Sequence, residues 1–596
     1  MHHPQGLLMS WKKLWTRRKT EPETPRVDPA AAYSEGMEAW ERGELDLAEQ
    51  RLVEAAEAAP EELKHVGNLG NLYHQRGKLA DALRCHEKAA ELAPDLSVAH
   101  RNRGRVLAEM GRFLEASKAL DQSLGIEPDH AETALLCAQA LAESGAKDRA
   151  SLRCEESIAE GAASPDLHTF YLEMLIACGQ LEKAAAAARL PDIAAKTLQR
   201  LGRRQLRSNQ PADAAESLSR AAAALPEDHG TLFDLAIAQK NAGDRLASQQ
   251  SFERATELLP DDPRSRSNLG WLQLQNGQTD QALVSMRQAA ALEARTHAPP
   301  EELAEVPAHR IHHDAEQFRH ILEHGTLSTE AQPYAAAVMA LDESLDPGTE
   351  TVDLTAPKHA DIRAGWSMNH HLPDCPALPE GALNPALDLD RLQADYHQSS
   401  PEMVVVDDLL RPEALAALQA WCREATIWKR TYDNGYVGAF MRSGLATPLL
   451  VQLSEELRTA LPRIMKDHRL EQCWAFKCDN TKKGVNLHAD VAAVNVNFWI
   501  GPDEGNENPE QGGLLVWDVE SPPDWAFADY NANQPKMRTF LEGAGAEAIR
   551  IPHRCNRALI FNSTLFHETD QIVFRPDYEN RRINITLLYG IRLLES

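Results

Sequence analysis

The chain of 596 residues contains no long uninterrupted apolar run. A helix that spans a bilayer needs roughly 18 to 20 mostly apolar residues in succession, so we expect no transmembrane segment. The first residues are rich in basic side chains but lack the apolar core of a secretory signal. We therefore expect residues 1–28 to form a disordered leader.

Cysteine and basic residues are also scarce. The nine cysteines are scattered, odd in number and without a CxxC pair, which favours a reducing compartment, and hence the cytoplasm, over a disulfide framework. Only 62 basic residues stand against 89 acidic ones, giving a net charge of −27. Because proteins bind nucleic acid by neutralising phosphates with Lys and Arg, we expect no nucleic-acid partner.

The first half of the chain repeats with a period of 34 residues. Pro60, Pro94 and Pro128 are spaced by this interval, and so are Pro226 and Pro260. Small residues, which let helices approach closely, recur in three columns: Gly36, Gly70, Gly104, Gly202 and Gly270; Ala48, Ala82, Ala116, Ala150, Ala214 and Ala282; and Ala55, Ala89, Ala221, Ala255 and Ala289. A fourth column, suited to ending a helix, contains Gly77, Gly111, Gly145, Gly243 and Gly277.

This pattern resembles the tetratricopeptide repeat over residues 29–297, with about eight repeats. The resemblance implies an all-α superhelix of helix pairs whose concave face binds another chain. We therefore expect a protein or peptide partner on that face. The alternative is that the array packs only against the rest of its own chain.

Residues 298–400 are expected to form a connector, because three prolines near its start mark a boundary and residues 346–400 are rich in proline and polar residues. Apolar periodicity predicts helices within it at 314–324 and 331–345. Four polar residues near the first of these helices are candidates for a metal cluster: His309, His312, His313 and Asp314. We favour the alternative that they are solvated, because no second group of ligands accompanies them.

From residue 401 onward, short apolar runs alternate with Gly, Pro and Asn, which is typical of a β-rich domain. A strand is predicted from Met403, followed by an amphipathic helix with Pro412 in its first turn. At least six strand-like runs are present in all. We predict that residues 401–596 form a double-stranded β-helix, or jelly roll, with flanking helices.

The sequence NLHAD brings two metal-binding residue types, His488 and Asp490, close together. Residues i and i+2 of a strand point to the same side, so both could address one ion. His567, after the strand-like run RALIFN, is the best candidate for a third ligand. Two histidines and one carboxylate on one side of a metal form the facial triad of non-haem iron(II) oxygenases. The alternatives are a hydrogen-bonded surface pair and the zinc site of a hydrolase.

In its context this motif resembles the iron(II)- and 2-oxoglutarate-dependent dioxygenases, particularly those with prolyl 4-hydroxylase-like catalytic domains. The resemblance covers about residues 403–593. Besides the NLHAD sequence it rests on VVVDDLLRPEAL, the GGL strand start, ALIFNSTLFHET and RRINITLLYG. It implies iron(II) held by His488, Asp490 and His567, 2-oxoglutarate as cosubstrate, and ascorbate as a further candidate cofactor. Related halogenases lack the carboxylate, so Asp490 favours hydroxylation.

The resemblance also implies a cation that grips the distal carboxylate of 2-oxoglutarate. In this family an Arg or Lys on the strand after the second histidine has that role, and Arg582 is the first choice here, with Arg581 the second. A buried guanidinium suits a carboxylate because the two can pair through parallel hydrogen bonds. Further candidates for the cosubstrate pocket are Asn584, Asn495, Asn497 and Lys477.

The leading hypothesis is an oxidoreductase: an iron(II)- and 2-oxoglutarate-dependent hydroxylase that acts on a protein or peptide recruited by the repeats. The choice of a polypeptide substrate rests on fold-level analogy. One alternative is a repeat scaffold whose jelly roll does not catalyse. Another is an oxygenase that acts on a small molecule.

Overall fold

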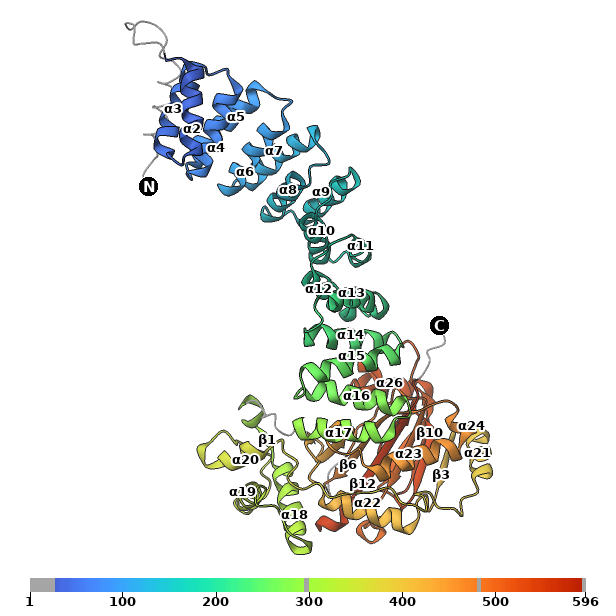
Figure 1. The fold of residues 1–596 in the computed structure, drawn as a ribbon. Coiled ribbons are helices and arrows are strands. Elements are labelled where there is room, and N and C mark those ends of the chain that lie inside the picture. The colour runs from blue at the N-terminus through green and yellow to red at the C-terminus, as the bar shows by residue number, and fades with distance from the viewer. Residues whose placement is uncertain (1–26, 294–299, 480–483, 592–596) are drawn as a thin grey trace. The chain divides into compact units, whose positions relative to one another are not determined.

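The computed structural model describes residues 27–293, 300–479 and 484–591, and Figure 1 shows its helices and strands. The chain divides into two compact units, Met1–Asp244 and Arg245–Ser596. Among the described residues, no helix combines the length and the apolar character needed to cross a membrane.

The described part of the first unit consists of helices. Their bounds are α2 Pro29–Glu41, α3 Leu45–Ala58, α4 Leu63–Gln75, α5 Leu79–Leu92, α6 Ser97–Glu109, α7 Phe113–Ile126, α8 Ala131–Glu143, α9 Lys147–Ala159, α10 Pro165–Ala177, α11 Leu181–Ala187, α12 Ala195–Arg207, α13 Pro211–Ala224 and α14 His229–Asn241. The recurring glycines explain the pairing. A Cβ on Gly104 would lie 2.5 Å from Cγ of Leu120, so glycine lets α6 and α7 pack closely. Gly77 joins α4 to α5 with a positive φ of 71°.

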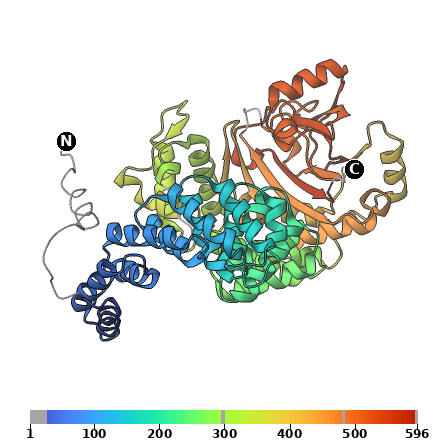
Figure 2. The ribbon, with the colours of Figure 1, turned by 90° about the horizontal axis from the view of Figure 1, so that it is seen from above.

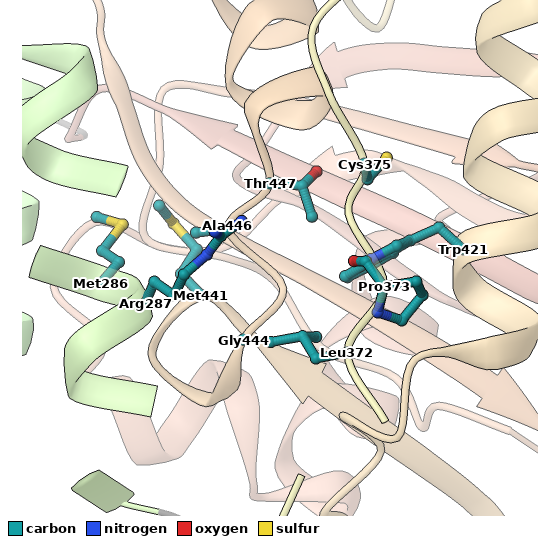
Figure 3. Close-up of a pocket in the computed structure, with 10 residues that line it drawn as sticks. All are labelled: Met286, Arg287, Leu372, Pro373, Cys375, Trp421, Met441, Gly444, Ala446 and Thr447. Atoms are coloured by element: carbon teal, nitrogen blue, oxygen red, sulfur yellow. The ribbon is translucent and has the colours of Figure 1, made fainter. Parts of the chain in front are cut away.

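The second unit begins with three more helices of the same kind, α15 (Arg245–Leu258), α16 (Pro263–Gln275) and α17 (Thr279–Glu293). The described stretch 27–293 therefore holds sixteen helices, which agrees with about eight helix pairs. In the second unit, Trp271 Nε1 of α16 donates to the carbonyl oxygen of Glu471 at 3.0 Å. Beside α17, Met286 and Thr447 help to line a small pocket (Figure 3).

The strands of the second unit form two larger antiparallel sheets and one small β-ladder. One sheet has seven strands in the order β3-β10-β7-β12-β6-β5-β4, and the other has three in the order β11-β8-β9. Their bounds are β3 Met403–Val406, β4 Arg430–Tyr432, β5 Tyr436–Phe440, β6 Leu470–Cys478, β7 Val494–Trp499, β8 Leu514–Glu520, β9 Ala548–Ile551, β10 Ala558–Asn562, β11 Leu565–Thr569 and β12 Ile583–Tyr589. Strands β1 (Val306–Pro307) and β2 (Thr351–Val352) form the ladder. The β-rich prediction is confirmed.

The two faces of the seven-stranded sheet have different neighbours. On the outer face, Val496 and Ile585 share a core with Leu418 of α22 (Pro412–Glu424) and Leu453 of α23 (Pro448–Ala460). On the inner face, the apolar residues that pack with the three-stranded sheet are Trp499, Leu559, Phe561, Leu514 and Val516. The helix predicted around Pro412 is α22. The inner face also encloses polar side chains of β7 and β12.

The connector is a folded layer with its own core. Its main helices are α18 (Ala308–His324), α19 (Gln332–Glu343) and α20 (Ala360–Gly365), and α21 (Leu389–Gln398) follows. Ile311 and Phe318 of α18 pack with Tyr334 and Val338 of α19. Figures 1 and 2 show α18 to α20 on one side of the orange strands and α21 on the opposite side.

Helix α18 is tied to the sheet region by polar contacts. Glu316 accepts hydrogen bonds from Arg581 Nε and Nη2 at 2.8 and 2.6 Å. The Gln317 side chain donates to the carbonyl oxygens of Arg423 and Ala425, at 2.9 and 3.1 Å, where α22 ends. The connector is therefore joined directly to Arg581, which immediately precedes Arg582 and the start of β12.

The prediction that the polar residues of this helix are solvated is wrong for His313 and Asp314, whereas His312 is exposed. Arg310 and His313 are fully buried, and Asp314 is 4% exposed. Asp314 accepts hydrogen bonds from Arg310 Nε at 2.8 Å and from the Tyr334 hydroxyl at 2.8 Å, and its Oδ1 lies 3.0 Å from His313 Nδ1. Burial is tolerated because Arg310, one helical turn earlier, neutralises the carboxylate. The helix also begins at Ala308, six residues before the predicted start.

Candidate metal centre

The backbone holds His488 and His567 directly opposite each other. The amide of His488 donates to the carbonyl of His567 at 3.0 Å, and the amide of His567 donates back at 2.8 Å. The two residues form an isolated β-bridge, while strand β7 begins only at Val494. The expectation that His488 and Asp490 lie on one continuous strand is thus wrong. Asp490 is placed instead by its amide, which donates to the carbonyl of Ser563 at 3.0 Å.

The three predicted ligands nevertheless meet at one point. One potential ligand atom from each of His488, Asp490 and His567 lies within 4.8 Å of the other two. His488 Nε2 is 3.8 Å from Asp490 Oδ1, and His567 Nε2 is 3.6 Å from Asp490 Oδ2. The two imidazole ring centroids are 4.3 Å apart. This arrangement leaves room for one ion between the three side chains.

The outer nitrogen of each ring is already engaged by the backbone. His488 Nδ1 lies 2.8 Å from the carbonyl oxygen of Asn486, and His567 Nδ1 lies 3.0 Å from that of Leu565. A carbonyl oxygen only accepts, so each Nδ1 carries a proton and donates it to that oxygen. A second hydrogen bond of this kind orients ligand histidines in metal sites. Both rings therefore direct Nε2 toward Asp490.

Burial shapes the charge of the centre. Loss of solvent raises the pKa of Asp490 above its ordinary value, against the opposing effects of His488 and Asn495. Loss of solvent and the neighbouring His488 lower the pKa of His567 well below its ordinary value. His567 is therefore neutral at neutral pH and free to bind a metal, and the positive charge of an ion would favour ionised Asp490.

Two predicted asparagines line the inner face beside this centre. Asn495 Nδ2 donates to Asp490 Oδ2 at 3.0 Å, and Asn497 Nδ2 donates to Thr586 Oγ1 at 2.9 Å. The side-chain oxygens of both asparagines are buried and find no hydrogen-bond partner among the described residues, and the same holds for Trp499 Nε1. Buried polar atoms are nearly always paired, so these three atoms indicate room for a polar group.

Arg582 lies beside the same inner face, immediately before the start of β12. It is 1% exposed. Its Nε donates to the carbonyl of Gly512 at 2.6 Å, and its Nη1 donates to Asn584 Oδ1 at 2.8 Å. The guanidinium carbon is 5.9 Å from the Trp499 ring centroid. Arg582, Asn584 and the two asparagines of β7 therefore share the enclosed face, whereas Arg581 is bonded to Glu316 in the connector.

The prediction that Lys477 lines this pocket is wrong. Lys477 pairs with Ile583 across β6 and β12, which places it on the outer face. Its ammonium donates to the Cys422 carbonyl at 2.9 Å and to the Tyr578 hydroxyl at 2.7 Å. It also lies 4.4 Å from the Trp428 ring centroid. The sheet thus separates Lys477 from the metal centre.

Two neighbours of the site were not identified from the sequence. The Phe561 ring centroid is 5.0 Å from that of His567. His553, 6.1 Å from Trp499, is buried, and neither of its ring nitrogens has a hydrogen-bond partner in the described part of the chain. Burial, reinforced by Arg582, lowers the pKa of His553 to about 3. A single histidine after a strand gives no signal in the sequence that would single it out.

Comparison with known proteins identifies the helical region. Residues 61–129, 107–172 and 251–284 each match the tetratricopeptide repeat family. The N-terminal region contains tetratricopeptide repeats. A search of curated proteins found no match to the chain.

Solved structures also resemble the chain. A tetratricopeptide repeat protein from Parabacteroides merdae is 14% identical, with 44% of this chain and 93% of that chain covered and a TM-score of 0.26. The TPR2AB-domain:pHSP90-complex of yeast Sti1 is 18% identical, with coverage of 39% and 91% and a TM-score of 0.23. The MamA protein is 13% identical, with coverage of 39% and 92% and a TM-score of 0.16.

Successive tetratricopeptide repeats are linked by polar side chains on their first helices. Asn68 of α4 donates to the Tyr33 hydroxyl of α2 at 2.5 Å. Asn102 of α6 donates to Asn71 of α4 at 3.2 Å, and Arg105 donates to Asn102 Oδ1 at 3.3 Å. The first two contacts join the first helices of neighbouring repeats, and the third lies within α6. These residues form a polar ladder along the first helices.

Proposed function

We propose that residues 401–596 are a jelly-roll dioxygenase that uses iron(II) and 2-oxoglutarate to hydroxylate a protein or peptide. The observation that carries the proposal is the meeting of His488, Asp490 and His567 with both histidine Nδ1 atoms held by carbonyls. A seven-stranded and a three-stranded antiparallel sheet around the inner core support the jelly roll.

The donor set fits iron(II). Two imidazole nitrogens and one carboxylate suit a facial triad, and three ligands leave further coordination positions for other molecules. His488, Asp490 and His567 would hold the ion, and Asn495 would orient the carboxylate through its 3.0 Å hydrogen bond. A zinc hydrolase receives less support, because the described inner face offers no further carboxylate or neutral histidine placed at the triad.

The polar face between the triad and Arg582 fits 2-oxoglutarate. Asn495, Asn497 and Trp499 alternate along β7 and each has one unpartnered buried polar atom. Arg582 stands at the far end of this row, since Leu588, Thr586 and Asn584 pair in turn with Asn495, Asn497 and Trp499. An elongated dicarboxylate could thus lie along the row with its distal carboxylate on the guanidinium.

Bound together, iron(II) and 2-oxoglutarate would let dioxygen convert the cosubstrate to succinate and carbon dioxide while one oxygen atom enters a substrate C–H bond. The residues of the chain would bind the ion and the cosubstrate and orient them. His488 and His567 direct Nε2 inward, Arg582 fixes the cosubstrate, and Phe561 and the sheet core exclude water.

The open side of the inner face is aromatic. Trp474 of β6 pairs with Thr586, and Phe440 of β5 pairs with Trp474, so the three side chains share one level of the sheet. Trp474 and Phe440 are half-buried. An apolar stretch of a polypeptide could cover them while one residue reaches the metal. The repeats, with their polar ladder, would recruit the polypeptide.

Succinate formation tests the function. The full chain, prepared without oxygen and supplied with iron(II), should convert 2-oxoglutarate to succinate when air is admitted. Proteins captured on the chain should gain one oxygen atom by mass spectrometry. Tight iron binding without any succinate, in the presence of captured partners, would instead support a non-catalytic scaffold.

Arg582→Gln should raise the KM for 2-oxoglutarate. Hydrogen bonds to charged groups contribute about 1.5–3 kcal/mol, so we expect an increase of roughly 10- to 100-fold, with iron(II) binding retained. Arg581→Gln is the matched control, because that neighbour binds Glu316 instead. Equal effects of the two substitutions on KM would exclude Arg582 as the anchor.

A further inference from the structure

A second group of metal-binding side chains lies outside the triad. His320 and His324 occupy the last turn of α18, one helical turn apart, so both project from the same side of the helix. Glu579 faces them from η5, a short 3-10 helix at Tyr578–Asn580. Potential ligand atoms of these three residues lie within 4.8 Å of one another.

The spacing within this group suits an ion better than a direct hydrogen bond. His320 Nδ1 lies 3.4 Å from Glu579 Oε1, beyond the usual 2.7–3.2 Å of an N–H···O bond. Bonds of about 2.0–2.1 Å to a tetrahedral zinc ion place its ligand atoms about 3.3 Å apart. The observed separation therefore matches two ligands of one ion.

The two rings are also arranged as ligands. Their centroids are 4.3 Å apart and their planes differ by 32°. His324 Nδ1 lies 2.9 Å from the carbonyl oxygen of His320 and donates to it, which leaves Nε2 as the ligand atom of this ring. A hydrogen bond from Nδ1 to a backbone carbonyl also orients His488 and His567.

The geometry points to a second divalent metal site, of the zinc class, formed by His320, His324 and Glu579. His324 and Glu579 are exposed while His320 is largely buried, so water can enter from the open side and complete a tetrahedral shell. The site would join α18 to the segment that leads into Arg581 and Arg582. It does not depend on the proposed oxygenase function.

Zinc binding to the full chain tests this site. The parent chain and all variants carry Asp490→Ala and His567→Ala, so that the triad cannot contribute. Zinc affinity is measured by competition with a chromophoric chelator and its stoichiometry by elemental analysis after dialysis. The expected result is one zinc ion per chain, with binding weakened by more than roughly 10-fold in His324→Gln and in Glu579→Gln.

His397→Gln is the matched control. His397 is also an exposed helical histidine, with Nδ1 3.2 Å from a single glutamate, Glu402, but it has no second histidine beside it. Its replacement should leave zinc binding unchanged. The proposal is overturned if no zinc binds, or if His324→Gln and Glu579→Gln bind zinc as the parent does. Circular dichroism of each variant shows whether it is folded.

Discussion

Replacing Asp490 with alanine is expected to remove iron(II) binding and all succinate formation. Asp490 contributes the only carboxylate near both ring nitrogens of the described triad, at 3.8 and 3.6 Å. Loss of a hydrogen bond behind a ligand weakens metal binding roughly 10- to 100-fold, and loss of the ligand itself should exceed that. Iron content after anaerobic gel filtration and succinate yield measure the two effects.

The matched control is Asp524→Ala, which removes an exposed carboxylate outside the triad. This control should retain both iron and succinate formation. If Asp490→Ala retained iron at the parent level, the three side chains would not form the metal site. If it lost iron while the parent chain formed no succinate, the metal site would stand and the oxygenase proposal would fall.

Asp314→Asn should destabilise the second unit by about 3–5 kcal/mol, the usual cost of breaking a buried ion pair. The substitution keeps the shape of the side chain but leaves the buried Arg310 guanidinium without its counter-ion. Arg310 also packs 4.9 Å from the Trp366 ring centroid. Urea denaturation followed by tryptophan fluorescence would report the loss as an earlier unfolding transition.

The same pair predicts how stability depends on pH. Burial alone would raise the pKa of Asp314, but Arg310 and His313 outweigh it and hold that pKa well below its ordinary value. A depressed carboxyl pKa stabilises the folded state at neutral pH, and this contribution is lost as the pH falls through the folded-state pKa. Asp314→Asn should therefore lose less stability on acidification than the parent chain does.

Asp361→Asn, at an exposed position of α20, is the control for both measurements. Surface substitutions of this kind usually change stability by no more than about 0.5 kcal/mol. If Asp314→Asn unfolded at the same urea concentration as Asp361→Asn, the Arg310–Asp314 ion pair would not contribute to the stability of the second unit.

The helical array was predictable because its constraints are local and recur. Gly104 occupies the same place in its helix pair as Gly36 and Gly70, and in each case a Cβ would meet the facing helix within 3 Å. Because no side chain fits at this position, glycine recurs there in each of these repeats. The meeting of His488, Asp490 and His567 was expected for a different reason: residues 403–593 resemble a family in which the matching positions share one site.

The failed predictions concern residues whose neighbours are distant in sequence. Strand β6 is apolar on both faces, with Trp474 and Phe476 on one and Cys473 and Ala475 on the other. Alternation therefore could not place Lys477. Asp314 looked solvated because its partner Tyr334 lies on another helix, although Arg310 at i−4 was a local signal that could have been used.

The contacts of α18 and α16 determine which fragments of this protein can fold when they are expressed alone. A fragment starting at residue 401 would lose Glu316 and Gln317, leaving the Arg581 guanidinium without its carboxylate and removing one hydrogen bond from each of two carbonyls at the end of α22. It would also lose Trp271, which bonds the start of β6. Expression of the sheet region alone should therefore begin near residue 245 to yield folded material.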